Sequence, residues 1–145
     1  GQKEAALRAL AAKDKEKAGI TKESATQSNE ALKDIHFDFN KYLIRVGDRE
    51  VLQKIANYLL AKKNVKITIE GNCDERGTAE YNMALGFRRA YEAKKYIANL
   101  GVPKKRMKTV SYGKEKPVDP EHDEEAWAKN RRDHFVINYN LSHII

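Results

Sequence analysis

The chain has one cysteine, three prolines and one tryptophan among its 145 residues. A single cysteine excludes an internal disulfide and argues against a structural zinc site built from cysteines. No apolar run approaches the roughly 20 residues that a transmembrane helix needs. Aromatic residues make up only 8% of the chain, and few of them lie among the basic residues. This scarcity argues against a nucleic-acid or anionic-polymer binder, which the net charge of +7 would otherwise permit.

What is present is enough for one globular domain. Hydrophobic residues account for 41% of the chain and charged residues for 34%, so a sizeable core can form. Residues 1–33 differ from the rest because they are polar, rich in Ser and Thr, and begin with a short helix-forming stretch. We predict a flexible tether over residues 1–33, with a docked N-terminal helix as the alternative, and a folded domain over residues 34–145.

From Asp34 onward, strand-like and helix-like segments alternate. Hydrophobic residues with a period of two predict strands, and three- and four-residue spacings predict helices. The predicted strands cover 35–40, 65–71, 106–113 and 134–139, and the predicted helices cover 48–64, 79–99 and 123–132. This order predicts an α/β fold, an α+β sandwich in which βαβ-type units form a mixed sheet of about four strands covered by helices.

The densest group of charged residues lies between Gly71 and Ala90, where a predicted strand passes into the longest predicted helix. Asp74 follows the strand, and Asn82 and Arg89 share one stripe of the helix. A carboxylate and a guanidinium held close together would bind a zwitterion, because one takes an ammonium and the other a carboxylate. The alternative is that Asp74 and Arg89 pair with each other and merely hold the loop.

Other residues in this region have plainer interpretations. We expect Arg76 and Arg88 to face solvent or make structural pairs. Cys73 is expected to be a small buried residue rather than a nucleophile, because no cysteine–histidine signature accompanies it. The acidic run around His122 resembles a metal-ligand cluster, but its acids suit the start of a helix, so capping is the favoured interpretation. The residues indicate no metal or cofactor site and no enzyme.

The stretch GNCDERGTAEYNMALGFRRA at 71–90 closely resembles the central motif of OmpA-like peptidoglycan-binding domains. Three further blocks agree in the same order: IHFDFNKYLI at 35–44, TVSYGKEKPV at 109–118 and HDEEAWAKNRR at 122–132. The resemblance covers about residues 34–140. Within the family, the CDERGT wording favours a lipoprotein over a porin or a flagellar stator, which remain the alternatives.

The resemblance implies a non-enzymatic domain that binds the meso-diaminopimelate of the peptidoglycan stem peptide. The family's binding aspartate aligns with Asp74 and its binding arginine with Arg89. The remaining positions that the resemblance places at the ligand are Phe39, Asn40, Asn82 and Leu85. Many members carry Asp where this chain has Asn40, and often His where it has Asn72. A backbone contact at position 40 would survive that change.

The resemblance also implies where such a protein works. It predicts a lipid-anchored protein on the periplasmic face of the Gram-negative outer membrane, with Tol-system partners such as TolB. The acylated cysteine that would carry the lipid anchor is missing from this chain, so residues 1–33 are expected to be the tether that follows it. A flexible tether of this length spans roughly 30 Å.

Overall fold

The computed structural model describes residues 32–139, and these form a four-stranded sheet with the order β1-β4-β2-β3. The strands are β1 (Ile35–His36), β2 (Val65–Asn72), β3 (Met107–Gly113) and β4 (Arg132–Tyr139). β2 and β3 run parallel, whereas β4 is antiparallel to both β1 and β2. The predicted α/β fold with a mixed sheet of about four strands is therefore confirmed.

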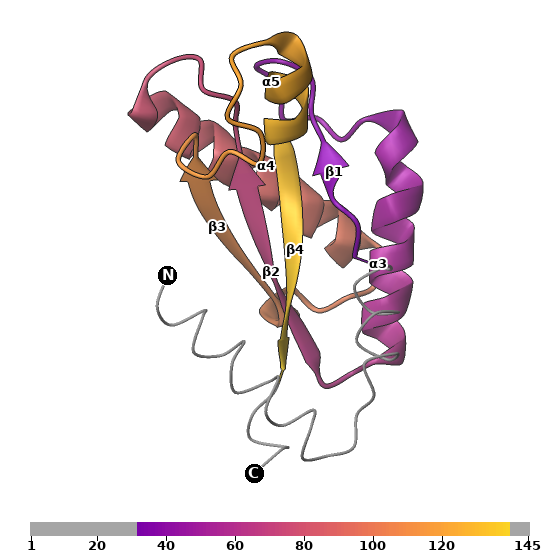
Figure 1. Ribbon diagram of the computed structural model, residues 1–145. Coiled ribbons are helices and arrows are strands. Elements are labelled where there is room, and N and C mark those ends of the chain that lie inside the picture. The colour runs from indigo at the N-terminus through magenta and orange to yellow at the C-terminus, as the bar shows by residue number, and fades with distance from the viewer. Residues whose placement is uncertain (1–31, 140–145) are drawn as a thin grey trace, which may run out of the picture.

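In the described part of the chain, three α-helices accompany the sheet: α3 (Arg49–Ala61), α4 (Ala79–Asn99) and α5 (Glu124–Asn130). Short 3₁₀ turns at Val46–Asp48 and Lys104–Arg106 precede α3 and β3. Helix α4 provides the crossover between the parallel strands β2 and β3 and lies across one face of the sheet, with α3 beside it (Figure 1). Helix α5 sits at the end of the sheet where β2 finishes and β4 begins (Figure 1). Within the described residues, no helix combines the length and apolar character that crossing a bilayer requires.

The core lies between the sheet and helices α3 and α4. The alternating residues Val65, Ile67 and Ile69 point from β2 into it, as their period of two predicts. The helices contribute stripes with helical spacing, namely Leu52, Ile55, Ala56 and Leu59 from α3 and Ala90, Ala93 and Ile97 from α4. Leu32 is also buried in this core. The predicted tether lies outside the described residues except for Leu32 and Lys33, so its boundary stays a prediction.

The strand predicted over 35–40 was too long. It ends at His36, because Asn40 adopts a left-handed backbone conformation (φ 60°) and turns the chain. Asparagine tolerates this conformation better than most residues. Phe37 still points into the core, held by a hydrogen bond from its backbone N to the Arg131 carbonyl (3.0 Å). Phe39 instead lies in the turn and is 52% exposed.

The helix predicted over 48–64 begins at Arg49 and ends at Ala61, so it is shorter than predicted at both ends. Asp48 stands at the start of α3, but its side chain caps no helix amide. Its carboxylate accepts a hydrogen bond from the backbone N of His36 (3.0 Å) and so ties β1 to the helix. The helix predicted to reach residue 132 ends at Asn130, because Arg132 already pairs with His36 in the sheet.

Candidate functional site

A pocket of about 310 Å³ opens between the turn after β1, the end of β2 and the first turns of α4. Its lining brings together every site residue that the sequence predicted: Phe39, Asn40, Asp74, Asn82, Leu85 and Arg89. They come from segments far apart in the chain. The turn after β1 reaches the others because β1 lies at the sheet edge, and α4 reaches them because it starts directly after β2.

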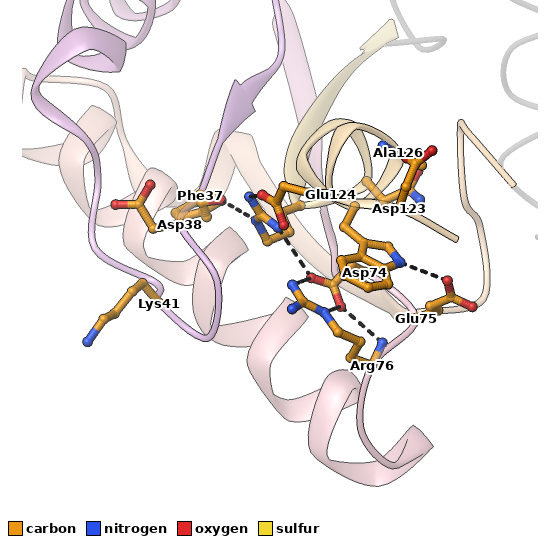
Figure 2. A network of polar contacts seen from close by, with 12 residues as sticks. Phe37, Asp38, Lys41, Asp74, Glu75, Arg76, Asp123, Glu124 and Ala126 are labelled. Carbon is orange, nitrogen blue, oxygen red and sulfur yellow. Dashed lines mark hydrogen bonds and ion pairs between the residues drawn. The ribbon is translucent and has the colours of Figure 1, made fainter. Parts of the chain in front are cut away.

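Asp74 is held in place by arginines. Its Oδ1 accepts hydrogen bonds from the backbone N (3.0 Å) and Nε (3.1 Å) of Arg76. Its Oδ2 lies 2.7 Å from Nη2 of Arg76 (Figure 2). The same oxygen lies 3.5 Å from Nη1 of Arg131. Burial raises the pKa of Asp74, but the hydrogen bonds from Arg76 outweigh burial, and the net pKa lies below the ordinary value. The carboxyl group is therefore ionised at neutral pH.

Arg89 is only 1% exposed and connects segments of the chain that line the pocket. Its guanidinium donates to three backbone carbonyls, those of Lys41 (2.8 Å), Asn72 (3.0 Å) and Asp38 (3.2 Å). These bonds tie the turn after β1 to the end of β2. Burial lowers the pKa of this guanidinium, whereas nearby Cys73 and other acidic groups act in the opposite direction. A guanidinium carries more N–H groups than these three bonds use.

Direct pairing of Asp74 with Arg89, the alternative interpretation, is not what the structure shows. Within residues 32–139, the ion pairs of Asp74 are made with Arg76 and Arg131. Arg89 is turned instead toward backbone carbonyls of the β1 turn and of β2. Both charges thus line the pocket without neutralising each other through a direct contact.

The β1 turn supplies an aromatic ring and an amide at the mouth of the pocket. The guanidinium of Arg76 lies over the ring of Phe39, 3.8 Å from its centre. The hydroxyl of Tyr81 hydrogen-bonds to Oδ1 of Asn40, which links the turn to the start of α4. An uncharged amide at position 40 therefore has a structural partner of its own.

Helix α4 carries the remaining lining residues on one stripe. Thr78 caps the helix, its Oγ1 accepting from the backbone N of Tyr81 (3.1 Å). Asn82 donates from Nδ2 to the carbonyls of Arg76 (2.8 Å) and Thr78 (3.1 Å), which fixes the loop against the helix. Leu85 and Arg89 follow at three- and four-residue steps, and all of this stripe is buried. Gly77, with φ +97°, makes the turn that this packing needs.

The interpretations of Cys73 and of the acidic run agree with the structure. Cys73 is buried, its thiol donates to the carbonyl of Asn82 (3.2 Å), and burial raises its pKa to about 11. Such a thiol is a poor nucleophile at neutral pH. Asp123 caps α5, its carboxylate accepting from the backbone N of Ala126 (2.8 Å). Across residues 32–139, no group of acidic, histidine or cysteine side chains is arranged to hold a metal ion.

Three residues near Asp74 were not assigned to the site from the sequence: Arg76, which lines the pocket, and Arg131 and Trp127, which contact Asp74 and Arg76. Arg76 was expected to face solvent or make a structural pair, and it does pair, but within the pocket lining. Arg131 comes from the end of α5, and Trp127 packs its ring 4.1 Å from the Arg76 guanidinium. Of these contacts, only the Asp74–Arg76 pair could have been predicted from the sequence, because the two residues lie two positions apart in a tight turn. The contacts from α5 depend on the tertiary fold.

Behind the pocket, Asp133 is fully buried on the core side of β4. Neither of its carboxylate oxygens has a hydrogen-bond partner among the described residues. Burial raises its pKa well above the ordinary value of 3.8, and the nearby Arg89 opposes that shift only in part. In its charged form this group is therefore costly to bury.

This carboxyl group predicts a dependence of stability on pH. Because its folded-state pKa is raised, the folded protein keeps a proton that the unfolded chain releases. That contribution to stability is complete below the unfolded pKa and is lost as pH rises toward the folded pKa. Asp133→Asn stays neutral at every pH in this range. We therefore expect its free energy of unfolding, relative to that of the parent, to increase as pH rises from 4, by at most about 1.4 kcal/mol per pH unit.

Urea unfolding of both proteins between pH 4 and 8 measures this difference. Glu50→Gln is the control, because Glu50 is exposed and its ion pair among residues 32–139 is with Lys54 on the helix surface. A parent–variant difference for Asp133→Asn that stays constant across this range would contradict the prediction.

Comparison with known proteins identifies the family of this fold. Residues 36–131 match the OmpA family. The peptidoglycan-associated lipoprotein of Agrobacterium fabrum is 50% identical over 98 residues, which are 68% of this chain and 55% of that protein. This chain spans only 55% to 65% of the length of the curated relatives it matches.

Solved structures agree. The peptidoglycan-associated lipoprotein from Burkholderia pseudomallei superimposes with a TM-score of 0.72 at 45% identity, over 74% of this chain and 91% of that one. The C-terminal domain of Helicobacter pylori MotB shares the fold, with a TM-score of 0.70 at 24% identity over 78% of this chain and 92% of that one. The predicted resemblance is confirmed by a family match that covers most of the chain, and this chain belongs to the OmpA family.

Proposed function

We propose that this domain binds peptidoglycan without catalysis, by gripping the meso-diaminopimelate residue of the stem peptide. The observation that supports this proposal is the pocket lining, which contains both a buried acid, Asp74, and a buried guanidinium, Arg89. The names of the relatives point to the same polymer, since several are peptidoglycan-associated lipoproteins.

The chemistry of diaminopimelate suits these two charges. Its side-chain end carries an ammonium and a carboxylate on one carbon. Asp74 takes the ammonium, and Arg89 offers its remaining N–H groups to the carboxylate. The ring of Phe39 covers the aliphatic link of the ligand. Asn40, Asn82 and Leu85 shape the pocket around it.

A ligand of this size gives only modest affinity at one site. Retention on a cell wall comes instead from many sites along one polymer and from restricted diffusion near a membrane. In the whole protein, we propose that residues 1–33 tether the domain to a lipid anchor in the outer membrane. The domain would then link that membrane to the wall from the periplasm, with Tol-system partners such as TolB.

Binding of two synthetic tripeptides tests the grip on the zwitterion. One carries meso-diaminopimelate at its third position, and the other carries lysine, which keeps the ammonium but lacks the second carboxylate. We expect the lysine peptide to bind at least about tenfold more weakly, because a charged hydrogen bond contributes roughly 1.5–3 kcal/mol. Calorimetry gives the affinities, and amide chemical-shift changes locate the site.

Equal binding of the two peptides would refute the role of Arg89. Chemical-shift changes that avoid the turn after β1 and the start of α4 would refute the pocket. Sedimentation with isolated wall sacculi, in the absence and presence of the free diaminopimelyl peptide, checks that the polymer uses the same site.

A further inference from the structure

In the pocket, the position next to Asp74 is filled by a cation from the chain itself. Arg76 uses both oxygens of that carboxylate, with Nε on Oδ1 (3.1 Å) and Nη2 on Oδ2 (2.7 Å). Figure 2 shows the guanidinium of Arg76 lying against Asp74. An incoming ammonium would therefore meet an acid that is already paired.

Two aromatic rings hold this guanidinium from its faces. Its carbon lies 3.8 Å from the centre of the Phe39 ring and 4.1 Å from that of Trp127. Such cation–π contacts stabilise a cation further when it is partly desolvated. Trp127 is itself fixed, because its Nε1 donates to Glu75 (2.7 Å). The closed position of Arg76 is therefore built by side chains from three separate segments.

Arg76 is nevertheless the only one of the three arginines around the pocket whose surroundings permit it to leave. Its side chain is 32% exposed, whereas that of Arg131 is 8% exposed and is held by the Phe37 carbonyl (2.8 Å) and Glu124 (2.9 Å). Arg89 is more buried still and is held by three carbonyls. Arg131 and the Arg76 backbone amide would stay on Asp74 if the Arg76 side chain moved out.

We propose that Arg76 is an internal latch that occupies the cation position of the pocket and must release Asp74 before the ammonium of a ligand can bind. This inference rests on the proposed function, and it adds a residue that sets specificity. A ligand without an ammonium makes no contact with Asp74 that would replace the ion pair between Arg76 and Asp74. A ligand that brings an ammonium replaces one cation with another and adds its own contact to Arg89.

The latch lowers the measured affinity, because only the open fraction of the protein can bind. Removing it by Arg76→Gln is expected to tighten binding of the diaminopimelyl tripeptide by on the order of tenfold, mainly through faster association. Arg88→Gln is the matched control. Arg88 also stacks on an aromatic ring (4.5 Å from the centre of Tyr42) and pairs with an acid, Glu92 (3.0 Å), but it does not contact Asp74.

Trp127 is the only tryptophan in the chain and lies against the latch, so its fluorescence reports whether Arg76 moves. We expect the tripeptide to change Trp127 emission in the parent and in Arg88→Gln, and to change it far less in Arg76→Gln. Unchanged or weaker binding by Arg76→Gln would overturn the latch, and weaker binding would make Arg76 a ligand contact instead.

A measurement without ligand separates the latch from the proposed function. In the free protein, carbon-detected NMR titration of Asp74 should show a pKa that rises in Arg76→Gln and stays unchanged in Arg88→Gln. If the pKa of Asp74 is the same in the parent and in Arg76→Gln, the latch is overturned, whatever the binding experiment shows. If that titration shifts as expected but the parent fails to bind the tripeptide, the proposed function fails while the Arg76–Asp74 pair stands.

Discussion

Replacing Asp74 with asparagine is expected to weaken binding of the diaminopimelyl tripeptide by about 100-fold while leaving the fold intact. Asparagine keeps the shape of the side chain but is neutral, and its Nδ2 donates where one carboxylate oxygen accepted. Removing one partner of a buried, hydrogen-bonded charge pair costs about 2–5 kcal/mol of binding free energy, and about 1.4 kcal/mol corresponds to a factor of ten. Calorimetry at neutral pH measures the change.

The fold survives this change because the partners of Asp74 have other contacts. Arg131 keeps its hydrogen bonds to Phe37 and Glu124. Arg76 is partly exposed and can turn to solvent. We therefore expect a loss of only about 1–2 kcal/mol in the free energy of unfolding. Arg89 is a less suitable target, because its truncation would remove the donor of three backbone carbonyls, so an effect on binding could not be told from an effect on stability.

Glu50→Gln is the matched control for Asp74→Asn. It removes one negative charge from the exposed surface of α3, where Glu50 pairs with Lys54 (3.6 Å). It should bind like the parent, which would show that net charge alone is not responsible. If Asp74→Asn also bound like the parent, the acid would have no part in holding the ligand.

The second large effect is expected from Gly71→Ala, which should destabilise the domain by about 3 kcal/mol or more. Gly71 lies on β2 where α4 crosses, and a Cβ there would stand 1.8 Å from the carbonyl oxygen of Gly86 and 2.6 Å from its carbonyl carbon. Both atoms belong to the helix backbone, so no side-chain rotation relieves the clash. The helix has to move away from the strand.

Such a movement would reach the pocket, because the same helix carries Asn82, Leu85 and Arg89. Urea unfolding followed by Trp127 fluorescence gives the change in stability, and tripeptide binding gives the effect on the site. Gly47→Ala is the control, since a Cβ at Gly47 would meet nothing within 4 Å. That variant should stay within about 0.5 kcal/mol of the parent. A similarly small change for Gly71→Ala would mean that the strand and helix are not in close backbone contact.

Long, periodic segments were the part of the fold that could be predicted from the sequence. The run from Val65 and the helix from Ala79 to Asn99 match their predicted positions almost residue for residue. Each buries one face, and the residues of that face recur with the period of a strand or of a helix. That period can be read from the sequence. Short elements were less predictable. The strand at Ile35 holds only two residues, and its alternation continues into a turn that Asn40 makes.

In the candidate site too, some contacts could be predicted from the sequence and others could not. Asp74, Asn82 and Arg89 were predicted to converge because they lie on one strand–helix unit, where spacing along the chain fixes distance in space. The partners of Asp74 were not predictable in full. Arg131 and Trp127 reach the loop from α5, and neither periodicity nor spacing says that α5 packs at that end of the sheet.

The sequence was sufficient to predict which segments form strands and helices, which faces they bury, and that an acid and a guanidinium lie beside one strand–helix junction. These properties are local, because they depend on residues within a few turns or strand positions of each other. Only the tertiary structure brings Arg131 to Asp74 and buries Asp133. Those outcomes depend on which distant elements pack together. That packing depends on the contacts of the whole chain and not on any one segment.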